Sequence, residues 1–253
     1  MTQPAAPERK GFSPIKSSDL PDAPYHRLLV YGAPKDGKTY TTGSTAEGPV
    51  FVINSDDKYS LQGLKDAGHS FETAFISGDN PQRMFDCIAF LREETKKGTY
   101  KSVIWDTASK YSWRALKVYE DATRNAKGES DGRRYWQQHR NHILSVVDGL
   151  INLDAHIIVN AHYKREFGAL VEGQAEKTGE GIVADMPGEL RMVFARDFQN
   201  VVFLQVNHQG KREFLWNMRG VWGPGGRTLP KDTSSFEPNV AGLWAAIQGR
   251  KKG

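Results

Sequence analysis

The sequence predicts an α/β protein whose mostly parallel central sheet is covered by helices on both faces. Apolar, strand-like segments alternate with helical patterns from His26 onwards, which is typical of parallel sheets that are buried on both sides. One strand–loop–helix passage, residues 31–39, fits the spacing G-x-x-x-x-G-K-[ST]. Two later apolar runs flank His208, Gln209 and Gly210 and predict a hairpin at the sheet edge near the carboxyl terminus.

The elements are expected in the following order along the chain. Strands are predicted at residues 28–31, 50–54, 74–77, 102–106 and 156–161, and the hairpin at 201–206 and 213–217. Helices are predicted over residues 39–45 and 82–96, from near residue 109, and over residues 136–153 and 240–248. Helices between successive strands are what a parallel sheet requires, because parallel strands need a crossover connection.

The chain of 253 residues is expected to form one domain over residues 23–248. Residues 1–22 hold four prolines with little apolar periodicity, which indicates a mobile arm, and residues 249–253 form a basic tail. A single cysteine, Cys87, excludes an internal disulfide, and no apolar run approaches the ~18 residues that a membrane span needs. With no signal-peptide core, these features favour a cytoplasmic protein without a membrane partner. The net charge of +4 permits contact with nucleic acid without requiring it.

The loop motif predicts a site for a nucleoside triphosphate. Gly32 and Gly37 let backbone amides approach a phosphate, and the helix that follows directs its positive dipole end at that charge. Lys38 is expected to reach the β- and γ-phosphates, and the Thr39 hydroxyl to bind Mg²⁺. The residues expected to contact the nucleotide are Gly32, Ala33, Pro34, Lys35, Asp36, Gly37, Lys38, Thr39 and Tyr40.

Acidic residues at strand ends predict the rest of a magnesium-dependent site. The fourth predicted strand ends in Asp106, which we expect to hold Mg²⁺ together with Thr39. Alternatively, Asp106 or Thr107 caps the next helix. The second predicted strand is followed by Asp56 and Asp57, and either acid suits the base that activates water or a solvent-facing turn. Asp56 is the first choice for the base.

The fifth predicted strand brings Asn160 and His162 to the same edge of the sheet. In open α/β sheets, ligands bind outside the carboxyl ends of the strands. A lone histidine is more often structural, but this position favours His162 as a sensor of the γ-phosphate.

These motifs, in this order, resemble the phage RecA-like recombinases found with single-strand annealing systems, within the wider class of phage nucleotide-binding ATPases. The resemblance covers about residues 25–244 and rests on residues 32–39, 103–107, 158–164, 185–190, 226–230 and 237–239. It implies a RecA-like P-loop NTPase core. By the family pattern, Asp56 is similar in place to the glutamate that activates water, although it is one methylene shorter. His162 stands where those cores carry a polar residue that couples the γ-phosphate to a DNA-binding loop.

The resemblance also implies that two polar, glycine-containing stretches, residues 124–134 and 163–181, project onto single-stranded DNA. Basic side chains there are expected to track phosphates, and aromatic ones to stack on bases. The residues so assigned are Arg124, Lys127, Arg133, Arg134, Tyr163, Lys164, Arg165 and Phe167. A place in a solvated connection is the alternative for each of them.

RecA-like ATPases commonly hold the nucleotide between protomers, which implies a homo-oligomer, either a ring or a filament. Arg227 is the residue expected to reach the γ-phosphate of a neighbouring protomer. The predicted function is a magnesium- and ATP-dependent ATPase that binds single-stranded DNA in phage recombination or strand annealing, with an annealing or single-strand-binding protein as a further partner. Two alternatives stay open: a nucleotide-gated DNA-binding module with negligible turnover, and a P-loop kinase for a small acceptor.

Overall fold

The sheet expected from the sequence forms the centre of the molecule. A computed structural model of the chain describes residues 24–125, 128–167, 180–216, 221–222, 224–226, 228–229 and 235–249. The expected arm at 1–22, most of the expected tail at 249–253, and the residues Lys127 and Arg227 lie outside the described residues. No helix in the described part of the chain is both long and apolar enough to cross a membrane.

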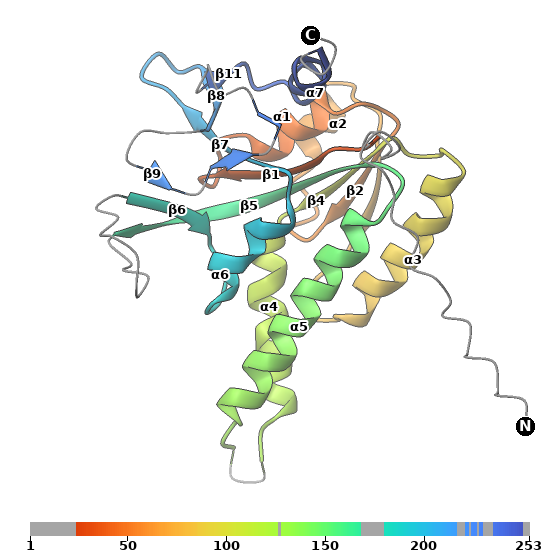
Figure 1. Ribbon diagram of the computed structural model, residues 1–253. Coiled ribbons are helices and arrows are strands. Elements are labelled where there is room, and N and C mark those ends of the chain that lie inside the picture. The colour runs from red at the N-terminus through yellow and green to blue at the C-terminus, as the bar shows by residue number, and fades with distance from the viewer. Residues whose placement is uncertain are drawn as a thin grey trace, which may run out of the picture.

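The strands of the main sheet are β1 (Arg27–Gly32), β2 (Val50–Asn54), β3 (Glu72–Phe75), β4 (Ser102–Asp106), β5 (His156–Phe167), β7 (Asn200–Val206), β8 (Arg212–Leu215) and β11 (Ser235–Phe236). They lie side by side in the order β11-β8-β7-β1-β5-β4-β2-β3 (Figure 1). Neighbours from β7 to β3 are parallel, whereas β8 is antiparallel to both β7 and β11. The predicted parallel sheet with an antiparallel hairpin near the carboxyl terminus is confirmed.

Three short strands extend this sheet. Strand β6 (Glu180–Ala184) is antiparallel to the outer part of β5, and β9 (Val221–Trp222) pairs with β6. Strand β10 (Gly225–Gly226) pairs with β7. As a result β5 runs beyond its parallel neighbours and continues as one arm of a β5–β6 hairpin (Figure 1).

Helices cover both faces of the sheet, as predicted. The helices α1 (Lys38–Thr45), α2 (Gln62–Asp66) and α7 (Val240–Gly249) lie on one face, and α3 (Gln82–Lys96), α4 (Ala108–Ala122) and α5 (Gly132–Ile151) lie on the other (Figure 1). A short helix, α6 (Leu190–Val193), and a 3₁₀ turn (Phe194–Asp197) follow β6. Helices α4 and α5 pack against each other and project away from the sheet.

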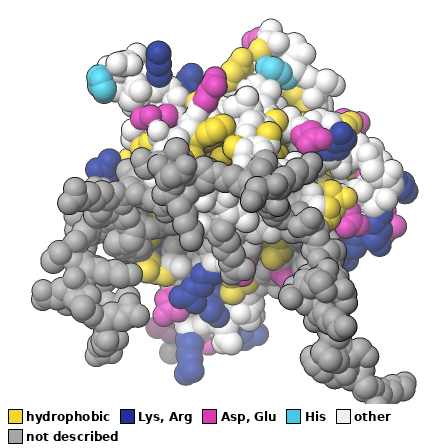
Figure 2. All heavy atoms as spheres, turned by 45° about the horizontal axis from the view of Figure 1, so that its top comes forward, with side chains coloured by type: hydrophobic (Ala, Val, Ile, Leu, Met, Phe, Trp, Pro, Cys, Tyr) yellow, Lys and Arg dark blue, Asp and Glu magenta, His cyan; other side chains and the backbone are white. Residues whose placement is uncertain are grey.

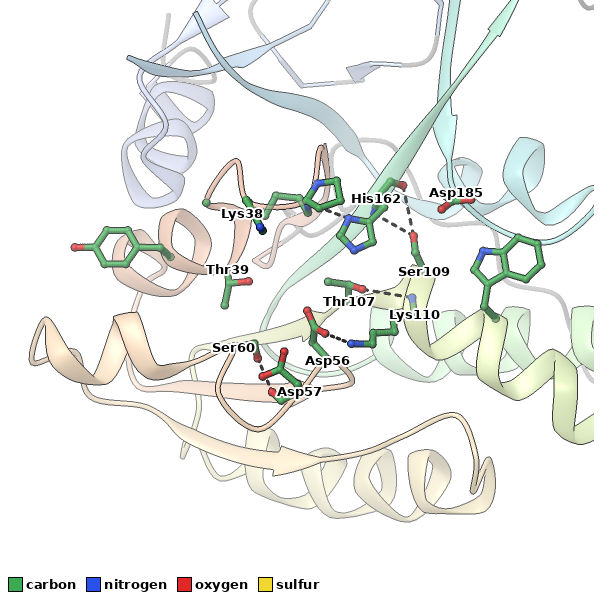
Figure 3. A pocket seen from close by; sticks show the side chains of 15 residues that line it. Lys38, Thr39, Asp56, Asp57, Ser60, Thr107, Ser109, Lys110, His162 and Asp185 are labelled. Atoms are coloured by element: carbon green, nitrogen blue, oxygen red, sulfur yellow. Dashed lines mark hydrogen bonds and ion pairs between the residues drawn. The ribbon is translucent and has the colours of Figure 1, made fainter. Parts of the chain in front are cut away.

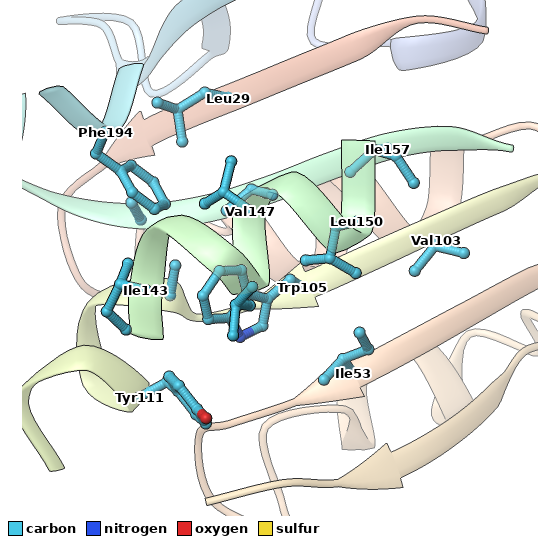
Figure 4. Close-up of a cluster of buried hydrophobic side chains, with 14 of the residues drawn as sticks. Leu29, Ile53, Val103, Trp105, Tyr111, Ile143, Val147, Leu150, Ile157 and Phe194 are labelled. Atoms are coloured by element: carbon cyan, nitrogen blue, oxygen red, sulfur yellow. The ribbon is translucent and has the colours of Figure 1, made fainter. Parts of the chain in front are cut away.

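The core is divided between the two faces by the alternation of side chains along each strand. Trp105 and Ile157 are fully buried and point toward α5, where they meet Val147 and Phe194 (Figure 4). The neighbouring strand residues, Ile158 among them, pack on the opposite face with the side chains of α7. Burial on both faces explains why these strands read as continuous apolar runs.

Local capping fixes where two helices begin. The Thr107 hydroxyl accepts a hydrogen bond from the Lys110 amide, and Asp131 accepts one from the Arg134 amide. Of the two residues that we considered as caps for α4, Thr107 therefore takes that role, which leaves the Asp106 carboxylate to the site.

Several predicted boundaries were wrong. Strand β3 lies two residues earlier than expected, because Glu72 pairs with Phe51 at the exposed sheet edge, where polar residues are tolerated. Helix α5 starts at Gly132, directly after its cap, instead of at 136. Residues 163–167, expected in a loop, continue β5 because they pair with β6. Helix α7 includes Gly249, which we placed in the tail.

Candidate nucleotide-binding site

The phosphate loop joins β1 to α1 in the conformation that its glycines allow. Gly37 has φ 89°, in the left-handed region, directly before α1. The Asp36 carboxylate accepts a hydrogen bond from the Ala33 amide at 3.0 Å, which closes the loop on itself. From β8, Arg212 donates through Nε to the Asp36 carbonyl at 2.7 Å. A Cβ atom on Gly37 would lie 2.6 Å from that Nε, so the close approach of Arg212 also requires glycine.

Lys38 is held inside the loop that precedes it. Its Nζ donates hydrogen bonds to the carbonyls of Gly32 and Ala33, each at 2.8 Å, and lies 3.3 Å from Nδ1 of His162. The side chain is buried, and loss of water around the ammonium lowers its pKa to about 8. The two carbonyls are uncharged and stabilise the ammonium less than an anion would, so Lys38 is suited to bind an anion such as a phosphate.

A second group of polar side chains lies beside the loop, at the ends of two strands. The Thr39 hydroxyl donates to Asp106 Oδ2 at 2.7 Å, and Asn160 Nδ2 donates to Asp106 Oδ1 at 2.9 Å. Asn160 also reaches the Thr42 hydroxyl at 3.0 Å. Asp106 is fully buried, and burial raises its pKa above the usual range. Hydroxyl and carboxylate oxygens are the ligands that Mg²⁺ prefers, so Thr39 and Asp106 fit that ion.

Asp56 and Asp57 take different places after β2. The Asp56 carboxylate forms an ion pair with Nζ of Lys110, in the first turn of α4 (Figure 3). The Asp57 carboxylate instead accepts the amide of Tyr59 at 2.7 Å and closes a turn. Both line the same cavity, but only Asp56 is joined to a residue on the opposite wall.

His162 occupies the far side of the phosphate loop on β5. Its backbone amide donates to the Ser109 hydroxyl at 3.0 Å, and its carbonyl accepts the amide of Asp185 at 2.8 Å. Burial and the nearby Lys38 ammonium lower the pKa of His162, so the ring is neutral near pH 7. A neutral imidazole beside Lys38 is able to change its hydrogen bonding when a phosphate arrives.

These residues surround one cavity of about 690 Å³ (Figure 3). Of the nine loop residues expected to contact nucleotide, Pro34, Lys35, Gly37, Lys38, Thr39 and Tyr40 line it. Gly32, Ala33 and Asp36 lie just behind them and supply the hydrogen bonds described above. The structure thus brings Lys38, Thr39, Asp56 and His162 together around a single space. Asp106 lies behind the wall of that space and reaches it through its hydrogen bond with Thr39.

Sequence reasoning missed several residues of this site. Lys110, Trp113 and Asp185 line the cavity, and Arg212 braces the loop. The position of Lys110, one helical turn after Asp106, was a usable signal, because the end of that strand was already placed in the site. No local pattern identifies Arg212, because its contact with the loop depends on the position of β8.

The residues assigned to DNA are not all gathered in one place. Arg133 and Arg134 are exposed at the start of α5, and Lys164 and Arg165 are exposed on the outer part of β5, a separate region of the molecule (Figure 1). Arg124 is paired with Glu120 at 3.0 Å and Asp121 at 2.9 Å. Tyr163 packs edge-on against Phe203, with ring centres 4.9 Å apart. Lys127 and the Phe167 side chain fall outside the described part.

Comparisons with known proteins bear on the family of the chain. The AAA domain family matches residues 25–230. The search of curated proteins gave no match. Among solved structures, one similar to this chain is a prototypical ATPase from the type III secretion system of pathogenic bacteria, with a TM-score of 0.45 and 11% identity over 71% of this chain. The chain covers about half, 51%, of that protein.

The family match spans most of the chain and includes the phosphate loop, Asp106 and His162. Binding of a nucleotide and of Mg²⁺ accompanies this loop and carboxylate generally. On this evidence the chain belongs to the AAA domain family and has the α/β fold of P-loop NTPases.

Proposed function

We propose that the chain is a RecA-like, magnesium- and ATP-dependent ATPase that binds single-stranded DNA and acts in phage recombination or strand annealing. One observation carries the ATPase part: Lys38, Thr39 and Asp56 line a single cavity at the carboxyl edge of the sheet, and Asp106 is hydrogen-bonded to Thr39 directly behind its wall. The DNA part rests on the sequence resemblance and on exposed basic residues near α5 and β5.

In this proposal each side chain has one task in hydrolysis. Lys38 and the loop amides hold the phosphates, and Thr39 and Asp106 hold Mg²⁺. When bound there, Mg²⁺ neutralises charge that develops on the phosphate oxygens. Asp56 orients the attacking water once Lys110 leaves its carboxylate, and His162 responds to the γ-phosphate through its contact with Lys38.

In this proposal a few exposed basic residues near α5 and β5 contact DNA, and no broad basic surface is needed. Among the described side chains that Figure 2 colours, Lys and Arg lie close to Asp and Glu. This agrees with a net charge of only +4. A protein with such a surface contacts few phosphates, so its affinity for DNA should depend moderately on salt.

Assembly into a ring or filament, with Arg227 reaching a neighbour's γ-phosphate, is part of the same proposal and rests on the resemblance alone. Mixing Arg227→Ala protein with Lys38→Ala protein tests it. Each variant should be nearly inactive, and the mixture should regain part of the activity, because an intact phosphate loop then meets an intact arginine. Full activity of Arg227→Ala protein alone contradicts the proposed role.

One observation favours a second candidate, a nucleotide-gated DNA-binding module with negligible turnover. The Asp56 carboxylate is neutralised by the Lys110 ammonium in this structure. A carboxylate that keeps this partner in the presence of nucleotide is a poor acceptor of a proton from water. The two candidates therefore differ in whether Lys110 releases Asp56.

The deciding experiment measures ATP hydrolysis with and without single-stranded DNA. The main proposal expects magnesium-dependent hydrolysis that DNA stimulates and that Lys38→Ala lowers by about 100-fold or more. Lys65→Ala, an exposed lysine on α2, is the matched control and should hydrolyse normally. Hydrolysis that ignores DNA removes the DNA part. DNA binding that depends on ATP without hydrolysis selects the second candidate.

A further inference from the structure

A second cavity, of about 570 Å³, lies between the first turns of α5 and residues 187–190, which lead into α6. None of its lining residues lines the nucleotide cavity. We name it the Trp136 cavity. Its wall includes Arg133, Trp136, Gln137, Arg140, Gly188 and Glu189.

The Trp136 indole forms a fixed aromatic surface in this cavity. It is 38% exposed. Gly188, with φ +57°, packs so closely that a Cβ atom there would lie 3.1 Å from Trp136 Cζ3. Tyr135 and His139 contact other sides of the ring, with ring centres 5.6 and 6.5 Å away. A ring held on several sides and exposed on the rest is prepared for stacking by a flat ligand.

Two arginines give the cavity a positive charge. Arg133 and Arg140 are exposed, and neither has an ion-pair partner among the residues that the structure describes. Glu189 is the acidic residue of the wall, so the guanidinium groups outnumber the carboxylate. Arg124, close by in sequence to Arg133, is instead neutralised by two acids. Unpaired guanidinium groups beside an exposed indole suit a ligand that is both flat and anionic.

A buried histidine adds a hydrogen-bond acceptor behind this surface. His139 also lines the cavity and is fully buried. Its Nε2 must carry the proton, because it donates to the Ser112 carbonyl at 2.9 Å. Nδ1 is then an acceptor, and it has no partner in the described part of the chain. Burial lowers the pKa of His139 to about 4, so the ring stays neutral.

We propose that the Trp136 cavity binds one unpaired nucleotide of a single-stranded nucleic acid, with the base stacked on Trp136 and the flanking phosphates on Arg133 and Arg140. The inference rests on the proposed function and makes it specific, since it places a base-stacking position on α5. A free nucleotide has the same chemistry, so the experiment separates these two sources.

The test measures binding of a fluorescent oligothymidylate to the intact protein over a range of salt concentrations. Trp136→Leu keeps apolar volume against Gly188 but removes the stacking face, and it should weaken binding by about 5- to 150-fold. Trp136→Phe should restore most of the affinity. Phe90→Leu, an exposed aromatic on α3, is the matched control and should bind like the wild type.

The arginines are tested by the salt dependence. Arg140→Gln should reduce the slope of log affinity against log salt by about 0.7, the value for one phosphate contact on a single strand. Arg92→Gln, an exposed arginine on α3, should leave the slope unchanged. Wild-type affinity in Trp136→Leu, or an unchanged slope in Arg140→Gln, overturns the proposal.

Failure of the proposed function is distinguishable from failure of this site. If wild-type protein binds no oligothymidylate at any salt concentration, DNA binding is absent and the proposed function loses that part. Equilibrium dialysis with ATP then decides the site. A second bound equivalent that Trp136→Leu loses assigns the cavity to a free nucleotide, whereas a single equivalent in the wild type overturns the site altogether.

Discussion

The buried Lys38 ammonium makes nucleotide binding a proton-coupled reaction. Burial holds its pKa at about 8, and its hydrogen-bond acceptors in this structure are the uncharged carbonyls of Gly32 and Ala33. A triphosphate bound in the loop places anionic oxygens beside Nζ, which favours the charged form and raises the pKa again. Each Lys38 that is neutral before binding therefore takes up a proton when the nucleotide binds.

The size of this effect follows from the pKa. At pH 8 about half of the Lys38 side chains are neutral, and at pH 7 about one tenth are. We expect about 0.5 proton taken up per nucleotide at pH 8 and about 0.1 at pH 7. Because the pKa in the folded state lies below the value of 10.5 expected in the unfolded chain, the free energy of unfolding rises between about pH 8 and 10.5, by about 3 kcal/mol in all.

Calorimetry of ATP binding with Mg²⁺, in two buffers with different ionisation enthalpies, measures the proton uptake. At pH 8 His162 is already neutral, because its pKa lies below the usual range, so Lys38 dominates the signal. Lys38→Met should abolish the uptake, and Lys65→Met should retain it. A binding heat that does not depend on the buffer at pH 8, or an uptake that persists in Lys38→Met, would refute the reasoning.

Four further predictions concern residues of the site and two glycines of the fold. Asp106→Asn should weaken activation by Mg²⁺ by about 10- to 100-fold in a titration of hydrolysis against metal, because it removes an anionic oxygen beside Thr39. Asp56→Asn should lower turnover by about 10²- to 10⁴-fold with little change in nucleotide affinity. Asp57→Asn, whose carboxylate closes a turn, should leave turnover unchanged. The reverse pattern would show that Asp57 is the base. Gly78→Ala should lower the free energy of unfolding by about 1–3 kcal/mol in a denaturant titration, because its Cβ would lie 2.2 Å from a backbone oxygen of α4. Gly63→Ala, inside α2, would place its Cβ 3.9 Å from Tyr40 Cδ2 without a clash, so it should instead raise that free energy by up to about 1 kcal/mol.

The local parts of the site could be predicted because each is encoded within one strand and the turn that follows it. The phosphate loop is a contiguous motif, and Asp106 ends an apolar run of β-prone residues. Parallel strands place their carboxyl ends at one edge of the sheet, so placing Asp56, Asp106 and His162 together needed only the fold class.

The remaining parts depend on packing between distant elements. The ion pair of Lys110 with Asp56 requires the first turn of α4 to face the end of β2. The polar residues after His162 were predicted as a loop because hydrophobic periodicity reveals only strands with a buried face. These residues form a strand because they pair with β6. The exposure of Trp136 also could not be predicted from the sequence, because a tryptophan in a helical pattern is ordinarily assigned to the core.

The position of β1 in the sheet has a consequence for how the protein is made. This strand leads into the phosphate loop near the start of the chain, yet both of its neighbours, β5 and β7, come from the second half. The brace from Arg212 to Asp36 joins residues 176 positions apart. Contacts between residues so far apart form late in folding, because closing a long loop costs chain entropy before the contacts stabilise the structure. A chain that is still being translated and has not yet emerged as far as β7 contains all residues of the phosphate loop, but it lacks the strand and the Arg212 contact that fix the conformation of the loop. Tight nucleotide binding is therefore expected only after the β7–β8 hairpin has been synthesised.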